Sequence, residues 1–140
     1  MMTRLRRTAL VAGLQAVLPA ALLCLTTAVF GADFDGSRRL ICATVDAHAC
    51  DPGDVCLRGL PDDLGVPRFM RIDFGEKTIA GPRRTTQIRF IDNGADQVLM
   101  QGTELGYAWT VVLDKTDGSM SMTLVNRDDT FTVFGYCTPS

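Results

Sequence analysis

The feature that most restricts the fold of this chain is the alternation, beyond residue 37, of short β-branched or aromatic runs with turn-forming residues. No stretch there repeats apolar residues at helical spacing, whereas many runs have the two-residue alternation of half-buried strands. Residues 68–74, for example, place Met70, Ile72 and Phe74 on one face, with charged residues between them. The pattern predicts an all-β domain.

About eight strands are expected, joined mostly by tight turns. They are predicted at residues 38–46, 68–74, 77–81, 87–92, 96–103 and 107–114, in a run with Met120, Met122 and Leu124, and at 130–137. Residues 60–64 leave room for one helical turn at most. Short connections favour antiparallel neighbours, so we expect an up-and-down meander that forms a small closed or partly open barrel. In a closed barrel the first and last strands pair.

Three turns carry specific expectations. Gly75-Glu76 is predicted as a two-residue hairpin loop with Gly first, and Asn93-Gly94 as a two-residue loop in which both residues have positive φ. Residues 114–118 form a longer loop with Gly118 in the left-handed region.

The first 31 residues have the organisation of a secretory signal. Met1–Arg7 is cationic, and an apolar run of signal-peptide length follows at 16–25. Small residues favour cleavage near 31/32, which leaves 32–140 as one domain. The alternatives are an uncleaved anchor, because 8–30 is uncharged and long enough to span a bilayer, and lipidation at Cys24.

Four of the five cysteines follow this leader, which is typical of a short exported domain with two disulfides. Loop entropy does not choose among the three pairings of Cys42, Cys50, Cys56 and Cys137. The turn-forming residues 51–54 favour pairing of Cys50 with Cys56, which leaves Cys42 with Cys137. The latter bridge would join the first and last strands. We therefore expect a periplasmic or secreted protein.

Net charge argues against nucleic acid as a partner. Without the three leader arginines the chain has 11 basic and 16 acidic groups, a net charge of −5, and phosphate binding needs a basic surface.

Candidate catalytic and metal-binding residues are few. His48 is the only histidine, and no G-x-S-x-G motif accompanies it. The acidic pairs Asp62-Asp63 and Asp128-Asp129 could serve a carboxylate-based hydrolase, but neighbouring residues do not direct two carboxyl groups to one bond. The cysteine spacing lacks a zinc knuckle. Residues 33–36 and 51–54 offer oxygen ligands for calcium, although turn formation explains these aspartates more simply. We therefore expect no catalytic, cofactor or metal site.

The barrel interior is the remaining candidate site. An eight-stranded barrel is filled by side chains or holds one small ligand. Four methionines on apolar faces suit either outcome, as do eight aromatic residues that we expect to lie mostly in the core. The methionines are Met70, Met100, Met120 and Met122, and the aromatic residues are Phe69, Phe74, Phe90, Tyr107, Trp109, Phe131, Phe134 and Tyr136. Arg83 and Arg84, in a predicted loop, are candidates for contact with an anionic partner or are simply solvated.

Four stretches carry a resemblance that extends over most of the region after the leader. Residues 67–74, 101–109, 117–120 and 134–139 resemble small exported proteobacterial proteins of no assigned function, which implies a bacterial periplasmic setting. In architecture alone the predicted barrel is similar to lipocalin-like barrels and to periplasmic lysozyme inhibitors.

The expected function is that of a non-enzymatic periplasmic module that binds a small apolar ligand or an envelope protein. The alternatives are an inhibitor of an envelope hydrolase such as lysozyme and, third, a carboxylate-based hydrolase.

Overall fold

The computed structural model describes residues 34–140, so the predicted leader, its cleavage site and the lipidation of Cys24 lie outside the described residues. The described chain is all-β apart from one short 3-10 helix. Its elements are β1 (Leu40–Cys50), β2 (Leu57–Gly59), η1 (Pro61–Leu64), β3 (Phe69–Asp73), β4 (Thr78–Ala80), β5 (Thr85–Asn93), β6 (Gln97–Glu104), β7 (Tyr107–Asp114), β8 (Ser119–Val125) and β9 (Thr130–Pro139).

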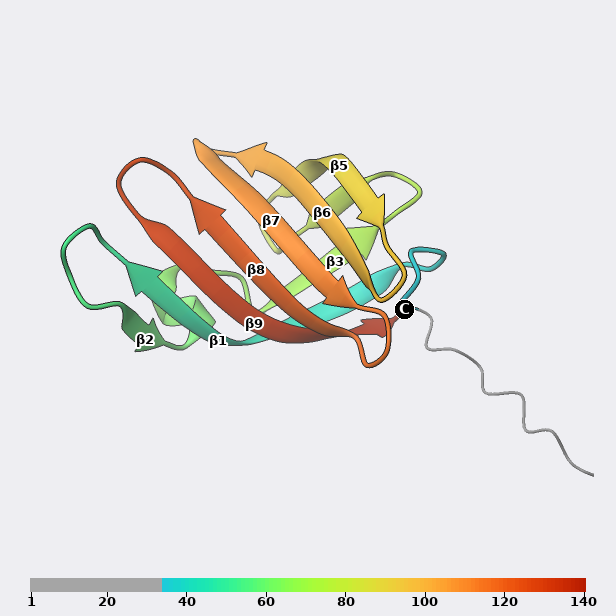
Figure 1. The fold of residues 1–140 in the computed structure, drawn as a ribbon, viewed down its shortest axis with the longest axis horizontal. Coiled ribbons are helices and arrows are strands. Elements are labelled where there is room, and N and C mark those ends of the chain that lie inside the picture. The colour runs from blue at the N-terminus through green and yellow to red at the C-terminus, as the bar shows by residue number, and fades with distance from the viewer. Residues whose placement is uncertain (1–33) are drawn as a thin grey trace, which may run out of the picture.

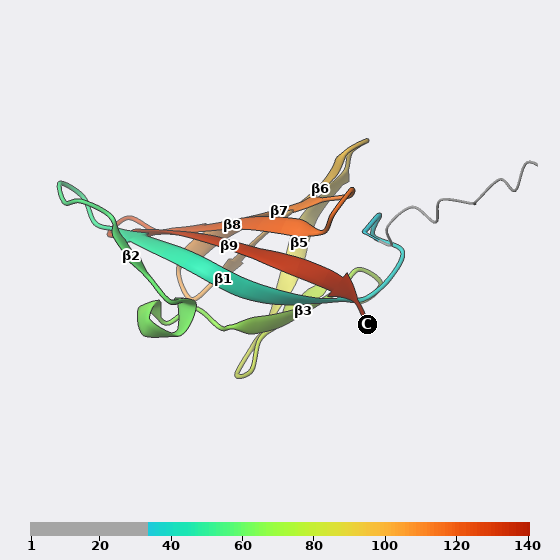
Figure 2. The same cartoon turned by 90° about the horizontal axis from the view of Figure 1, so that it is seen from below.

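The strands form a closed antiparallel barrel, as the sequence predicts. Strands β3 to β9 follow one another around the sheet, and β9 returns to pair with β1 along nearly the whole length of both strands. Figures 1 and 2 show β1 and β9 side by side in both views. The eight strands β1 and β3–β9 make the barrel, and β2 is an extra strand attached to its wall.

Both predicted disulfides are present. Cys42 and Cys137 are register partners on β1 and β9, so their bridge crosses the seam where the barrel closes. Cys50 and Cys56 close the loop between β1 and β2. Two disulfides in so short a domain indicate an oxidising compartment, either the periplasm or the extracellular space.

The short strand β2 was not predicted. Strand β1 runs on to Cys50, and its second half pairs with β2 through the partners His48 and Arg58, while its first half pairs with β3. A run of three residues, two of them exposed, carries no alternation signal. What makes it a strand is the disulfide-closed turn that folds it back on β1.

Two of the three turn predictions were wrong. The β3–β4 loop has four residues with Lys77 at φ 52°, and the Asp73 carboxylate accepts a hydrogen bond from the Glu76 amide at 2.9 Å. In the β5–β6 loop, Asn93 pairs with Val98 and neither residue of Asn93-Gly94 has positive φ. The prediction for Gly118, which has φ 74°, is confirmed.

The two-residue loop with positive φ at both positions joins β6 to β7 instead. Glu104 and Tyr107 are register partners, and between them Leu105 has φ 50° and Gly106 has φ 85°. Leucine is rarely found in this backbone region, because its Cβ crowds the following carbonyl group.

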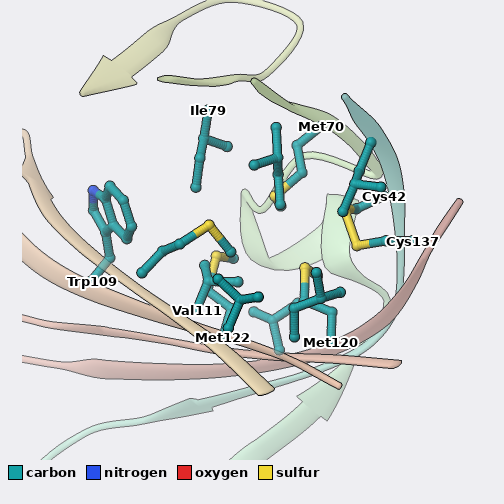
Figure 3. Close-up of a cluster of buried hydrophobic side chains, with 14 of the residues drawn as sticks. Cys42, Met70, Ile79, Trp109, Val111, Met120, Met122 and Cys137 are labelled. Carbon is teal, nitrogen blue, oxygen red and sulfur yellow. A yellow bond between two sulfur atoms is a disulfide. The ribbon is translucent and has the colours of Figure 1, made fainter. Parts of the chain in front are cut away.

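A methionine-rich core fills the middle of the barrel. Met70, Met120 and Met122 and the Cys42–Cys137 bridge gather there in Figure 3, with Val111 beside them and Ile79 and Trp109 further along. All four methionines that were expected on apolar faces are buried. Thioether side chains adapt to irregular space, which suits the interior of a small barrel.

The expectation that the aromatic residues lie mostly in the core was only partly right. Trp109 is buried, and Phe74 and Phe131 pack against the core from partly buried positions. Four others are exposed: Phe69, Phe90, Phe134 and Tyr136. At Phe90 the cause is a β-bulge between Ile88 and Phe90 on β5, which exchanges the inward and outward faces so that Ile91, and not Phe90, packs inward.

The right-hand end of the barrel in Figure 1, near the C-terminus, is closed by residues 34–39. The buried Phe34 ring lies against Gly118, where an added Cβ would be 2.5 Å from Phe34 Cζ. The Asn93 side-chain amide donates to the Asp35 carbonyl at 2.7 Å, and Lys115 Nζ donates to Asn93 Oδ1 at 2.9 Å. This end is therefore held shut by packing and by hydrogen bonds.

Candidate functional site

The opposite end of the barrel, at the left in Figure 1, is open and leads into a cavity of about 790 Å³. Its inner wall is apolar, with the buried side chains Val66, Met70, Ile79, Trp109 and Met122. Leu64, Leu124 and Phe131 continue this wall toward the mouth from partly buried positions. A volume between about 300 and 1,000 Å³ with an apolar lining is typical of small-molecule sites.

One side of the mouth is formed by η1 and the segment that follows it. Gly65, at φ 77°, ends the helix, and the chain then crosses the inner side of β1. There the buried Thr44 hydroxyl donates to the Pro67 carbonyl at 2.8 Å, and the Thr44 amide donates to the Arg68 carbonyl at 2.9 Å. A buried polar side chain is stable when it is hydrogen-bonded in this way. The mouth on this side is therefore anchored to the barrel wall.

Trp109 forms the opposite wall, and a glycine gives it the space to do so. Its register partner on β6 is Gly102, where an added Cβ would overlap the indole ring. The indole Nε1 points to the Thr86 hydroxyl at 3.4 Å, a long contact. Trp109 is the only tryptophan of the chain. Its fluorescence therefore reports directly on what enters the cavity.

Leu105, the left-handed residue of the β6–β7 loop, lies at the rim of this cavity. Its side chain is 72% exposed. The chain therefore combines an unfavourable backbone conformation with an apolar side chain in water, at the edge of an apolar cavity. Such combinations are concentrated at binding sites.

Charged residues are distributed unevenly around the mouth. Arg68, Arg83 and Arg84 lie on the side formed by β3 and the β4–β5 loop, and Glu104 lies at the end of β6, the strand that pairs with β5. Arg68 Nε is 3.5 Å from Asp62 Oδ2, and both side chains are more than half exposed. Neither Arg83 nor Arg84, within the described part of the chain, forms a salt bridge.

The two acidic pairs lie on different elements, η1 and the β8–β9 loop. Asp62 and Asp63 are exposed on η1. In the β8–β9 loop the Asn126 side-chain oxygen accepts hydrogen bonds from the amides of Asp128 and Asp129, at 2.7 and 2.8 Å. The Asp129 carboxylate also accepts a bond from the Tyr107 hydroxyl at 2.8 Å, and this bond raises the pKa of Tyr107. These contacts order the loop.

His48 lies on the outer wall of the barrel and not in the cavity. Its Nε2 is 3.5 Å from Asp46 Oδ2, and its ring meets the Phe134 ring edge-on at 6.3 Å between centroids. Arg58 Nε donates to the same carboxylate at 2.9 Å, which lowers the pKa of Asp46. This cluster ties β2 to β1 across the sheet.

The loops considered for calcium form turns. Hydrogen bonds from the Ser37 side chain and from the Ser37 amide, which is 2.9 Å from Asp35 Oδ1, lower the pKa of Asp35. The Asp54 amide donates to the Asp51 carbonyl. Asp33 lies outside the described residues. Among residues 34–140 no three His, Cys, Asp or Glu side chains are close enough together to share a metal ion.

Sequence reasoning identified the barrel interior and the two loop arginines but not the cavity itself. The cavity depends on where η1 and residues 65–68 cross the mouth, for which the local sequence holds no signal. The dipeptide Leu105-Gly106 held one signal that was missed, because a residue before glycine at a hairpin tip often has positive φ.

Within residues 34–140 there is no helix with the length and hydrophobicity needed to cross a bilayer. Comparison with protein-family models, with curated proteins and with solved structures found no match for this chain.

Proposed function

We propose that this protein is a non-enzymatic module of the periplasm or extracellular space that binds a small apolar ligand in the open end of its barrel. The observation that carries the proposal is the apolar cavity of about 790 Å³ in a barrel whose other end is closed. A barrel of this size is filled completely when side chains alone occupy it. Here the packed core ends at Trp109, Met122 and Ile79, and the space between these residues and the mouth is open.

Leu105 supports the same conclusion. A ligand seated in the mouth would cover this exposed side chain and remove apolar surface from water, at about 25 cal/mol per Å². The bound state would thereby compensate for a backbone conformation that is unfavourable in the free protein. In a purely structural hairpin, Asn or Gly at this position would be more stable.

Two neighbouring residues on β8 provide a matched test. Leu124 lines the cavity, whereas Val125 is exposed outside the lining. We expect Leu124→Trp to fill the mouth and abolish binding of the neutral apolar dye phenylnaphthylamine, measured by calorimetry, and Val125→Trp to leave binding unchanged. Native mass spectrometry of protein purified from the cells that make it should also show a retained ligand. Recovery of bare protein that also fails to bind the dye would refute the proposal.

A second candidate function is inhibition of an envelope hydrolase such as lysozyme, and the loop between β1 and β2 favours it. This loop extends beyond the barrel at the left of Figures 1 and 2 and is closed by the Cys50–Cys56 disulfide. Val55 on it is 89% exposed, and Leu57 at its end is 69% exposed. A constrained loop with exposed apolar side chains is suited to insertion into a cleft, because little conformational freedom is lost on binding.

A panel of lysozymes assayed with the protein tests this second function. Inhibition that Val55→Asp abolishes and Val125→Asp preserves would support it. Absence of inhibition across the panel would reject it.

A further inference from the structure

We propose that the ligand of the cavity is an amphiphile with a single apolar chain and an anionic head, and that Arg83 and Arg84 bind this head at the mouth. The inference rests on the proposed function and names the chemical class of its ligand. It is carried by the position, at the edge of an apolar cavity, of two guanidinium groups that have no acidic partner among residues 34–140.

The first step is the fixed position of the β4–β5 loop. The Gly81 amide donates to the Arg84 carbonyl at 2.8 Å, which closes a four-residue turn with Pro82 in it. The backbone at Gly81 also packs against Pro67, since an added Cβ there would lie 3.6 Å from Pro67 Cγ. Pro67 is itself held by Thr44. Arg83 and Arg84 therefore start from a backbone that is anchored to the mouth.

The second step is the electrostatic arrangement. Arg68 has Asp62 as a partner, whereas Arg83 and Arg84, in the described chain, have no acidic partner although both line the mouth. Residues 34–140 carry 11 basic and 15 acidic side chains, a net charge of −4. Two adjacent unpaired arginines on an acidic protein repel each other, and a bound anion would relieve this repulsion. Guanidinium groups bind carboxylate and phosphate with two hydrogen bonds, which suits such a head group.

The third step is that the apolar and basic surfaces are continuous. The inner wall consists of Met70, Ile79 and Met122 with Trp109, and Leu105 extends it to the rim at the end of β6, the strand that pairs with β5. A chain lying along this wall would bring its head group to the arginine side of the mouth. The ligand would thus lie with its chain in the cavity and its head group at the mouth.

Three probes with the same chain and different heads test this inference: decanoate, decanol and decyltrimethylammonium. Each is titrated into the disulfide-intact protein while Trp109 fluorescence is followed, and calorimetry is used as a second readout. Two exposed ion pairs contribute roughly a tenfold difference in affinity, so decanoate should bind about tenfold more tightly than decanol. We expect this preference to weaken at high salt, because the arginines are exposed.

The variant R83Q/R84Q should bind decanoate and decanol with nearly equal affinity. Its matched control is R89Q/R127Q, which removes the same charge from two exposed arginines outside the cavity lining and should keep the preference. Equal binding of decanoate and decanol by the unmodified protein would overturn the inference and leave the proposed function standing. Tightest binding of decyltrimethylammonium would also overturn it. Failure of all three probes to bind would count against the proposed function itself.

Discussion

Replacement of Leu105 by Asn should stabilise the protein and weaken ligand binding at the same time. Leu105 has φ 50° and is followed by Gly106 at φ 85°. A left-handed conformation costs an ordinary L-residue about 1–2 kcal/mol, and Asn-Gly is the preferred pair for this turn. Since the Leu105 side chain is 72% exposed, its removal sacrifices little packing. We therefore expect the free energy of unfolding to increase by roughly 1 kcal/mol.

The loss of affinity follows from the same side chain. Full burial of a leucine side chain is worth about 1.5–3 kcal/mol, and a ligand in the mouth would cover only part of Leu105. A loss of about 1 kcal/mol, or roughly fivefold in the dissociation constant, is expected for L105N. Urea unfolding followed by Trp109 fluorescence measures the first effect, and calorimetry with decanoate measures the second.

Lys77 supplies the control, because it is the other non-glycine residue with positive φ in the described chain, at 52°. It lies in the β3–β4 loop at the closed end and does not line the cavity. K77N should raise stability by a similar amount and leave binding unchanged. If L105N left stability unchanged or lowered it while K77N raised it, the strain assigned to Leu105 would be refuted. If both variants bound decanoate equally well, Leu105 would have no part in the site.

Three further predictions concern stability. Replacing Cys42 and Cys137 together with Ala should lower the free energy of unfolding by about 4–5 kcal/mol, because the bridge closes a loop of nearly the whole domain; equal urea midpoints for variant and parent would contradict this. Gly118→Ala should lower the free energy of unfolding by roughly 2–4 kcal/mol, because φ is 74° and the added Cβ overlaps the buried Phe34 ring. A lower melting temperature of this variant would confirm the loss. The amide of Glu76 holds the pKa of Asp73 below its usual range, so this carboxylate stabilises the fold above the unfolded-state pKa of about 3.9, and the contribution is lost as the pH falls through the folded-state pKa. Asp73→Asn should therefore make stability less dependent on pH below about 4, and an unaltered acid-unfolding curve would rule this out.

The fold was predictable because strand alternation and turn composition depend on local sequence. The alternation of Met70 and Ile72 on β3 and of Trp109, Val111 and Leu113 on β7 placed these residues in the core correctly. The prediction failed where the ladder is irregular. One extra residue at the β5 bulge places Phe90 outside, and no local pattern distinguishes that strand from a regular one.

The turn errors have a different cause. The dipeptide Asn93-Gly94 is typical of a tight hairpin turn. The Asn93 side chain, however, forms hydrogen bonds with Lys115 and with the backbone of Asp35, which are distant from each other in sequence. Tertiary hydrogen bonds of this kind override local turn preference. The cavity was hidden for a similar reason, because its mouth depends on the bond from Thr44 to Pro67, which joins residues 23 positions apart.

The pairing of β1 with β9 has a consequence for biogenesis. A chain made from its N-terminus presents Cys42 long before Cys137 exists, whereas Cys56 follows Cys50 almost at once. The barrel cannot close until translation has reached its last strand, and such long-range pairing is intrinsically slow. During that interval the early thiol is free to join the wrong cysteine. Maturation in the cell should thus depend on catalysed disulfide exchange, with the small loop formed first and the seam last.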